Sequence, residues 1–302
     1  MAGKGDSTRA ILIALGANLA IFVAKTVAAL LTRSSAMTAE AIHSLADCGN
    51  QVLLLWGLKT AKRAESEDHP LGYGKAIYFW SFLVALLLFT VGGVFSMYEG
   101  IHKLAEPEPI KWPWLALAVL AFGIGAEGIS MAGCMREVNK ARGSGSMWRW
   151  FRDSRQSELI VIFGEDLAAL LGLVFAFIAI LASMLTGNTV YDAIGSIAVG
   201  VLLIVVALFI AIEIKALLIG QSAEPMVQKE IYDFLEARPE VKRVLNIKTL
   251  QLGNDIMLAV KAEMSRDLST RGLVDEINRV EAALRKQFPD VRWCFFEPDV
   301  AD

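Results

Sequence analysis

The chain has 302 residues, of which 55% are hydrophobic and 20% are charged, and its formal net charge is -3 at pH 7. Its mean hydropathy is positive at +0.49, and a chain with so much apolar surface cannot hide it in a soluble core. The nearly balanced charge offers no basic face to nucleic acid, so we expect no nucleic-acid partner. The composition therefore indicates a protein that sits in a lipid bilayer.

Six apolar stretches are long enough to span that bilayer, since a spanning helix needs roughly 20 mainly apolar residues. They cover about 10–31, 36–60, 77–102, 113–135, 158–186 and 190–218. The polar N-terminus shows no cleavable signal peptide, so we expect the first span to direct insertion. Basic residues gather in the loops after the second and fourth spans, and the positive-inside rule then places both termini in the cytosol. This pattern predicts a multi-pass integral membrane protein, which in a bacterium would lie in the inner (cell) membrane.

Polar segments with short β-like runs replace the apolar spans after residue 220. We therefore divide the chain into a six-span transmembrane domain, residues 1–220, and a cytosolic α+β domain, residues 221–302. Helices and strands are predicted here over Pro225 to Ala237 (helix), Val241 to Leu252 (strand), Ile256 to Met264 (strand), Leu273 to Phe288 (helix) and Val291 to Phe296 (strand). One face of such a sheet needs cover, which helices and self-association can both supply.

Ionisable residues inside the spans are the candidates for function, because each costs about 2.5–3.5 kcal/mol or more at the bilayer centre. His43 and Asp47 are four residues apart in the second span, so their side chains share one helix face. Glu165 and Asp166 lie at a comparable depth in the fifth span if the two spans run antiparallel. One imidazole with two or three carboxylates suits zinc, and manganese, cobalt, iron and cadmium are alternatives.

The alternative to a metal site is a set of polar pairs that hold the helices together. Lys25 in the first span can pair with one carboxylate, but negative charge then remains, which a bound cation satisfies better. Adjacent residues diverge by about 100° around a helix, so Glu165 and Asp166 do not both have to face one ion.

Two further polar residues are candidates for the transport route. Asn50 lies two turns from His43 on the same side of the second span, where it can orient a ligand. Glu127 in the Gly-rich fourth span is a candidate proton relay. For both residues the alternative is an ordinary hydrogen bond between helices.

The sequence resembles the cation diffusion facilitator family, and within it the branch of solute carrier family 30 member 9. The matching segments are SSAMTAEAIHSLADCGNQ in the second span, DHPLGYGKA in the next loop, the Glu-Asp pair of the fifth span and YDAIGSIAVG opening the sixth. The resemblance covers nearly the whole chain. It implies a homodimer, a ferredoxin-like cytosolic domain of metallochaperone type, a transport site between the second and fifth helices, and metal-for-proton antiport.

The sequence departs from the family pattern at three places. Aligning the aspartate of the fifth-span HxxxD motif on Asp166 puts Ile162 where the histidine belongs, so Glu165 or a water has to complete the ligand shell. In the loop, His69 is retained and Tyr73 stands at the second histidine position. The tail has no histidine, so we expect it to be structural and dimerising rather than metal-sensing.

These features predict an exporter that exchanges zinc for protons by alternating access, since metal and protons compete for the same deprotonated ligands. A passive ion channel and a non-transporting membrane scaffold are the alternatives. We expect neither an enzyme nor a bound cofactor, because the sequence has no nucleophile with an adjacent base and no phosphate-binding glycine loop. Three widely spaced cysteines without a CxxC pair also argue against a thiolate zinc site.

Overall fold

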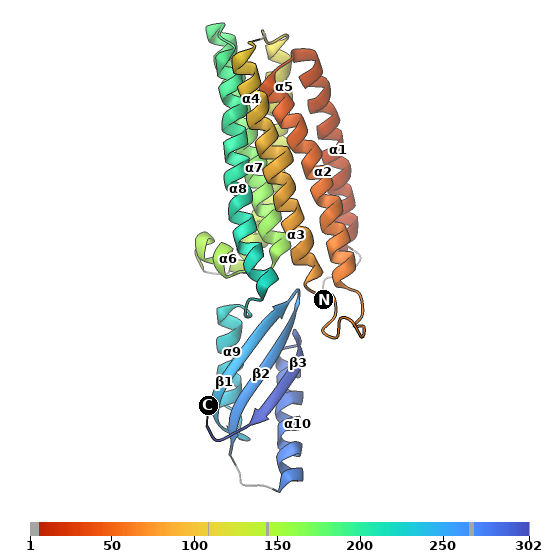
Figure 1. Cartoon of the computed structure of the whole chain (residues 1–302), viewed down its shortest axis with the longest axis vertical. Helices are drawn as coiled ribbons and strands as arrows, with labels where there is room; N and C mark the ends of the chain where they lie inside the picture. Colours follow the sequence, from red (N-terminus) through yellow and green to blue (C-terminus); the bar gives the residue numbers. More distant parts are fainter. Residues whose placement is uncertain (1–5, 108, 143–144, 266–268, 302) are drawn as a thin grey trace.

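The computed structural model describes residues 6–107, 109–142, 145–265 and 269–301, so the outer limits of the two predicted domains, residues 1 and 302, lie outside it. A long helical bundle carries a smaller α+β domain at one end (Figure 1). The bundle contains α1 (Asp6–Thr32), α2 (Ser35–Ala61), α3 (Ala76–Leu87), η1 (Leu88–Val94), α4 (Phe95–Ala105), α5 (Pro113–Arg142), α6 (Met147–Asp153), α7 (Ser157–Thr186) and α8 (Val190–Ile219).

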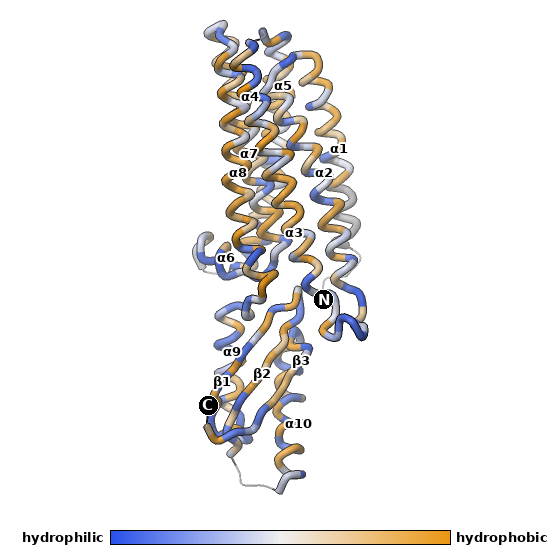
Figure 2. The backbone as a smooth tube through the Cα atoms, in the orientation of Figure 1, coloured by the Kyte–Doolittle hydropathy of each residue, from blue (hydrophilic) through white to orange (hydrophobic). Residues whose placement is uncertain are grey.

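Four helical runs in the described chain are long and apolar enough to cross a membrane: α3 to α4 taken together, α5, α7 and α8. The helix α2 has 27 residues, but Glu40, His43 and Asp47 interrupt its apolar sequence, and the described apolar part of α1 is Asn18–Thr32. Figure 2 shows hydrophobic residues along most of the bundle and more hydrophilic ones in the domain at its end. The predicted fold class, a six-helix membrane bundle with an α+β tail, is confirmed.

The short helix α6 was not predicted; it lies in the basic loop between the fourth and fifth spans. The side chain of Ser146 accepts a hydrogen bond from Arg149 N and so caps its first turn. Trp150 is buried, and its ring packs edge-on against Phe163 of α7. Because only seven residues form this helix, its single apolar turn is too short for a periodic signal in the sequence.

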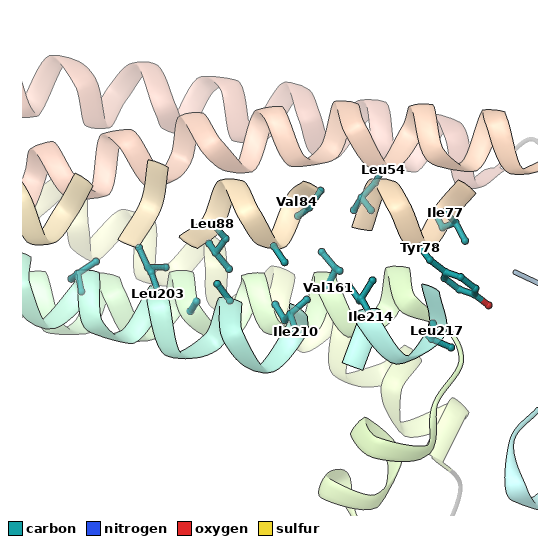
Figure 3. Packing of buried hydrophobic residues seen from close by; sticks show 14 residues of the cluster. Leu54, Ile77, Tyr78, Val84, Leu88, Val161, Leu203, Ile210, Ile214 and Leu217 are labelled. Carbon is teal, nitrogen blue, oxygen red and sulfur yellow. The ribbon is translucent and has the colours of Figure 1, made fainter. Parts of the chain in front are cut away.

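The core of the bundle forms where α2, α3, α7 and α8 meet. Its buried side chains include Leu54, Leu88, Val161, Leu203 and Ile210, which interdigitate along the helix axes (Figure 3). Other large apolar side chains point away from this core, as expected for surface that faces lipid rather than water.

The third span contains a wider π-helical segment, η1, which presents two glycines to its neighbours. A Cβ atom at Gly93 would lie 2.5 Å from Ile204 Cγ1, and one at Gly200 would lie 2.7 Å from Gly93 O. The backbones of η1 and α8 therefore touch, and only small residues fit there. A Cβ atom at Gly92 would lie 3.9 Å from His43 Nδ1, so η1 also borders the histidine of α2. Such π segments are frequent at functional sites.

The C-terminal domain consists of α9 (Pro225–Glu236), β1 (Val241–Leu252), β2 (Asp255–Met264), α10 (Thr270–Gln287) and β3 (Val291–Pro298), each within a few residues of its prediction. The sheet order is β1-β2-β3, with β1 antiparallel and β3 parallel to β2. Side chains from both helices, such as Ile231 and Val280, pack with Leu258 of the sheet. The two helices therefore cover one face of the sheet.

The tip of the β1–β2 hairpin meets the cytoplasm-facing end predicted for the bundle. Tyr78 at the start of α3 donates its hydroxyl to Gly253 O at 3.3 Å and accepts from Gly253 N at 3.0 Å. Gly253 has a φ of 70°, a conformation that favours glycine, and its backbone lies against Gly74. Arg155 donates to Ser222 O at 2.7 Å and ties the start of α7 to the same domain.

Candidate functional site

A stripe of buried polar side chains follows one face of α2. Its members are Glu40, His43, Ser44, Asp47 and Asn50, and none is more than 5% exposed. Their spacing of three or four residues is that of neighbours on one side of a helix. So many polar groups at the centre of an apolar bundle are costly unless they are paired, which makes this face of α2 the candidate functional one.

His43 and Asp47 lie next to each other on this stripe, as predicted. His43 Nδ1 is 3.6 Å from Asp47 Oδ1, which is too far for a strong hydrogen bond. In the part of the chain that the structure describes, both ring nitrogens of His43 and Asp47 Oδ1 have no hydrogen-bond partner. Neutral imidazole has one nitrogen with a free lone pair, so that nitrogen and Asp47 Oδ1 are two neighbouring atoms available to a cation.

Glu165 of α7 joins this group from the opposite side. Its carboxyl lies beside that of Asp47, and Asn50 Nδ2 donates to Glu165 Oε1 at 3.4 Å. Glu165 is 7% exposed, so all four polar side chains form one enclosed layer between α2 and α7. Asn50 therefore contacts Glu165, and its role in the transport route stays a prediction.

Asp166 points elsewhere. Ser130 of α5 donates to Asp166 Oδ2 at 3.2 Å, and Glu127 lies within electrostatic range one turn earlier on α5. The two neighbouring acids of α7 therefore face different helices, as the 100° offset between adjacent helical residues allows. The structure thus places Glu165 in the layer with His43 and Asp47. Asp166 lies beside this layer and faces α5, which carries Glu127.

No group of three His, Cys, Asp or Glu side chains among residues 6–107, 109–142, 145–265 and 269–301 is already spaced to hold a metal ion. The side chains of His43, Asp47 and Glu165 are neighbours, but their ligand atoms do not converge on one metal position. Ligand side chains have to move together before an ion is bound tetrahedrally. The predicted ligand set therefore stays a prediction.

Two further charged residues, one on α2 and one that contacts its start, were not singled out from the sequence alone. Glu40 lies one turn before His43, and its Oε2 accepts from Lys25 Nζ at 3.1 Å, so Lys25 pairs with a carboxylate that was not considered. A search for acids at steps of three and four residues from His43 would have found it. Asp192 at the start of α8 caps α2, since it accepts from Ser34 Oγ at 2.6 Å and from Ser35 N at 2.9 Å.

The loop after α2 presents His69 and Tyr73 on the surface. Their rings stack with centroids 4.2 Å apart, and both lie far along the chain from the α2 layer. Tyr73 is also within 4.7 Å of the Arg63 guanidinium, a cation–π contact. The tyrosine at the second histidine position therefore packs against its neighbours.

Both parts of the chain match models of known protein domains. A model described as the cation efflux transmembrane domain matches residues 11–219, and one described as the cation efflux protein cytoplasmic domain matches residues 223–295. The chain is 34% identical to the proton-coupled zinc antiporter SLC30A9, mitochondrial, of Xenopus laevis, over 88% of this chain and 47% of that protein. It is 31% identical to metal tolerance protein C4 of Arabidopsis thaliana, over 82% of this chain and 54% of that one.

A bacterial relative is similar over a longer share of its own length. The manganese efflux system protein MneP of Bacillus subtilis is 25% identical over 94% of this chain and 93% of that protein. By contrast, the chain spans about half the length of the animal and plant relatives. The transmembrane model matches residues 11–219, which is more than half of this chain. The chain therefore belongs to the cation efflux family, the cation diffusion facilitators that its motifs predict.

Proposed function

We propose that the protein moves a divalent transition-metal ion, zinc first among them, out of the cytosol in exchange for protons. The observation that carries this proposal is the enclosed layer of His43, Asp47 and Glu165. Asp47 Oδ1 and the lone-pair nitrogen of a neutral His43 ring have no hydrogen-bond partner among the described residues. Unpaired polar atoms in a membrane bundle are costly, and a cation that visits the layer would satisfy them.

The donor types in the layer favour zinc. One imidazole nitrogen and two carboxylates make a mixed nitrogen and oxygen set, which suits zinc and also admits manganese, cobalt, iron or cadmium. Two relatives point the same way, since their names give a zinc antiporter and a manganese efflux protein. Asp166 remains a predicted ligand, and α7 would have to turn by about 100° for it to replace Glu165.

Proton exchange follows from the same residues. A metal binds deprotonated imidazole and carboxylates, so each ion that leaves allows protons to return to His43, Asp47 or Glu165. Glu127 and Asp166 lie beside the layer on the α5 side and would carry protons to and from it. If the bundle opens the layer to each side in turn, metal and proton movements are coupled.

The surrounding topology is part of this proposal. Both termini and residues 221–302 lie in the cytosol, residues 1–220 form the membrane domain, and the membrane is the inner one if the protein is bacterial. Two copies pair through the C-terminal domain, whose uncovered sheet face carries Phe295 at 57% exposure. An exposed aromatic side chain on an uncovered sheet face fits a partner surface.

Reconstituted vesicles test the proposal. We expect the wild type to transport at least one of zinc, manganese, cobalt, iron and cadmium against its gradient when a pH gradient is imposed. Asp47→Asn should abolish this flux, whereas Ser183→Ala, which also alters a buried polar side chain, should keep it. Flux of no metal would favour a non-transporting scaffold, and flux that ignores the pH gradient would favour a channel.

A further inference from the structure

A buried ion pair lies one layer farther from the C-terminal domain than Asp47 and Glu165. Lys25 Nζ of α1 is 3.1 Å from Glu40 Oε2 and donates to Ser44 Oγ at 2.8 Å. Lys25 is 1% exposed and Glu40 is fully buried. The other carboxylate oxygen, Glu40 Oε1, has no hydrogen-bond partner in the described ranges, although a buried charge normally uses all its acceptors.

Four helices enclose this pair. A Cβ atom at Gly172 of α7 would lie 2.9 Å from Glu40 Oε1, and one at Gly123 of α5 would lie 3.8 Å from Lys25 Cε. Glycine at position 172 thus leaves room for the free carboxylate oxygen. The pair is therefore built into the packing of α1, α2, α5 and α7.

The pair and the proposed metal layer repeat the same contact between α2 and α7. Glu40 and Asp47 are seven residues apart on α2, and Gly172 and Glu165 are seven apart in the opposite direction on α7. At 1.5 Å per residue, the two layers are about 10 Å apart. Lys25 also donates to Ser44, the residue that directly follows His43 on α2. Glu40 lies between the proposed metal layer and the end of α2 that is farthest from the C-terminal domain.

The Lys25–Glu40 layer and the His43–Asp47–Glu165 layer differ in the net charge that they present to a divalent ion. Asp47 and Glu165 together offer two negative charges, which match one divalent ion. A free Glu40 would add a third charge and a second strong ligand along the route. An ammonium held against Glu40 removes both effects.

We propose that Lys25 is an internal counter-ion, which occupies Glu40 so that the divalent ion is held only in the His43–Asp47–Glu165 layer and is released past the pair. Lys25 is a positioning residue in this scheme and does not touch the metal. The inference rests on the proposed function and adds the residue that sets the affinity of its site.

A double-mutant cycle tests this role by the Michaelis constant for zinc flux in vesicles. Lys25→Met exposes the Glu40 charge and should lower the Michaelis constant and the maximal rate, each by about tenfold or more. Glu40→Gln leaves the ammonium uncompensated and should raise the Michaelis constant by about tenfold. The double variant, in which the pair is neutral, should return close to the wild type, as should Lys25→Arg.

A purely structural pair gives a different pattern. Both single variants would then lower the amount of folded protein, and neither would shift the Michaelis constant of the protein that folds. Equal shifts of one sign in the two single variants, or a double variant no closer to wild type, would overturn the inference. If Lys25→Met fails to fold, the Michaelis constants of Glu40→Gln and of the double variant still distinguish a counter-ion from a purely structural pair. Absence of any metal flux in the wild type would instead overturn the proposed function.

Discussion

Asp192 should be one of the most sensitive polar residues of the bundle. Its two carboxylate oxygens accept from Ser34 Oγ at 2.6 Å, Ser35 N at 2.9 Å, Ser35 Oγ at 3.0 Å and Ala36 N at 3.3 Å. The residue is fully buried and binds the free N–H groups at the start of α2. Hydrogen bonds to a charged group contribute about 1.5–3 kcal/mol each, and such contributions are not additive. We therefore expect Asp192→Ala to destabilise the protein by about 3–5 kcal/mol.

Thermal unfolding in detergent measures this loss. A loss of that size should lower the melting temperature by about 6 °C or more, at about 2 °C per kcal/mol. Ser196→Ala is the matched control, because Ser196 lies one turn further along α8 and its hydroxyl donates to Ser96 O at 2.8 Å. This control should cost about 1 kcal/mol. If Asp192→Ala is no less stable than Ser196→Ala, the capping role of Asp192 is refuted.

Three further outcomes are expected. Glu165→Gln should reduce metal flux at least tenfold more than Asp166→Asn, because Glu165 contacts Asp47; equal losses in a vesicle assay would contradict this placement. Gly253→Ala should destabilise the protein by about 1–2 kcal/mol or more, since φ is 70° and the new Cβ would lie 2.6 Å from Gly74 O; an unchanged unfolding temperature would contradict it. Burial raises the pKa of Cys294 from 9.0 to about 12, so the thiol should resist alkylation at pH 8 until the protein unfolds; fast labelling of the folded protein would argue against its burial.

Local patterns in the sequence were enough for most of the fold. Apolar stretches of bilayer length predicted the spans, and short β-like runs predicted β1 and β2 with ends close to those observed. Such signals depend only on residues near each other in the chain. The contact of Asp192 with Ser34 joins residues 158 positions apart, and no local period encodes which helices meet.

The candidate site shows the same limit. His43 and Asp47 were found because they repeat on one helix face. The roles of Glu165 and Asp166 depend on how α7 is rotated, and that rotation is set by close packing at Gly164 and elsewhere. Adjacent residues on a helix point about 100° apart, so sequence alone left both acids open. The structure turns Glu165 toward α2 and Asp166 toward α5.

The most direct test of the account records lumenal pH and lumenal zinc together in sealed vesicles that contain the wild-type protein. An imposed zinc gradient should drive protons in the opposite direction through the His43–Asp47–Glu165 layer, and Glu165→Gln should abolish both signals. Zinc entry without a change in pH, or an unchanged exchange in Glu165→Gln, would contradict the claim that metal and protons share this layer.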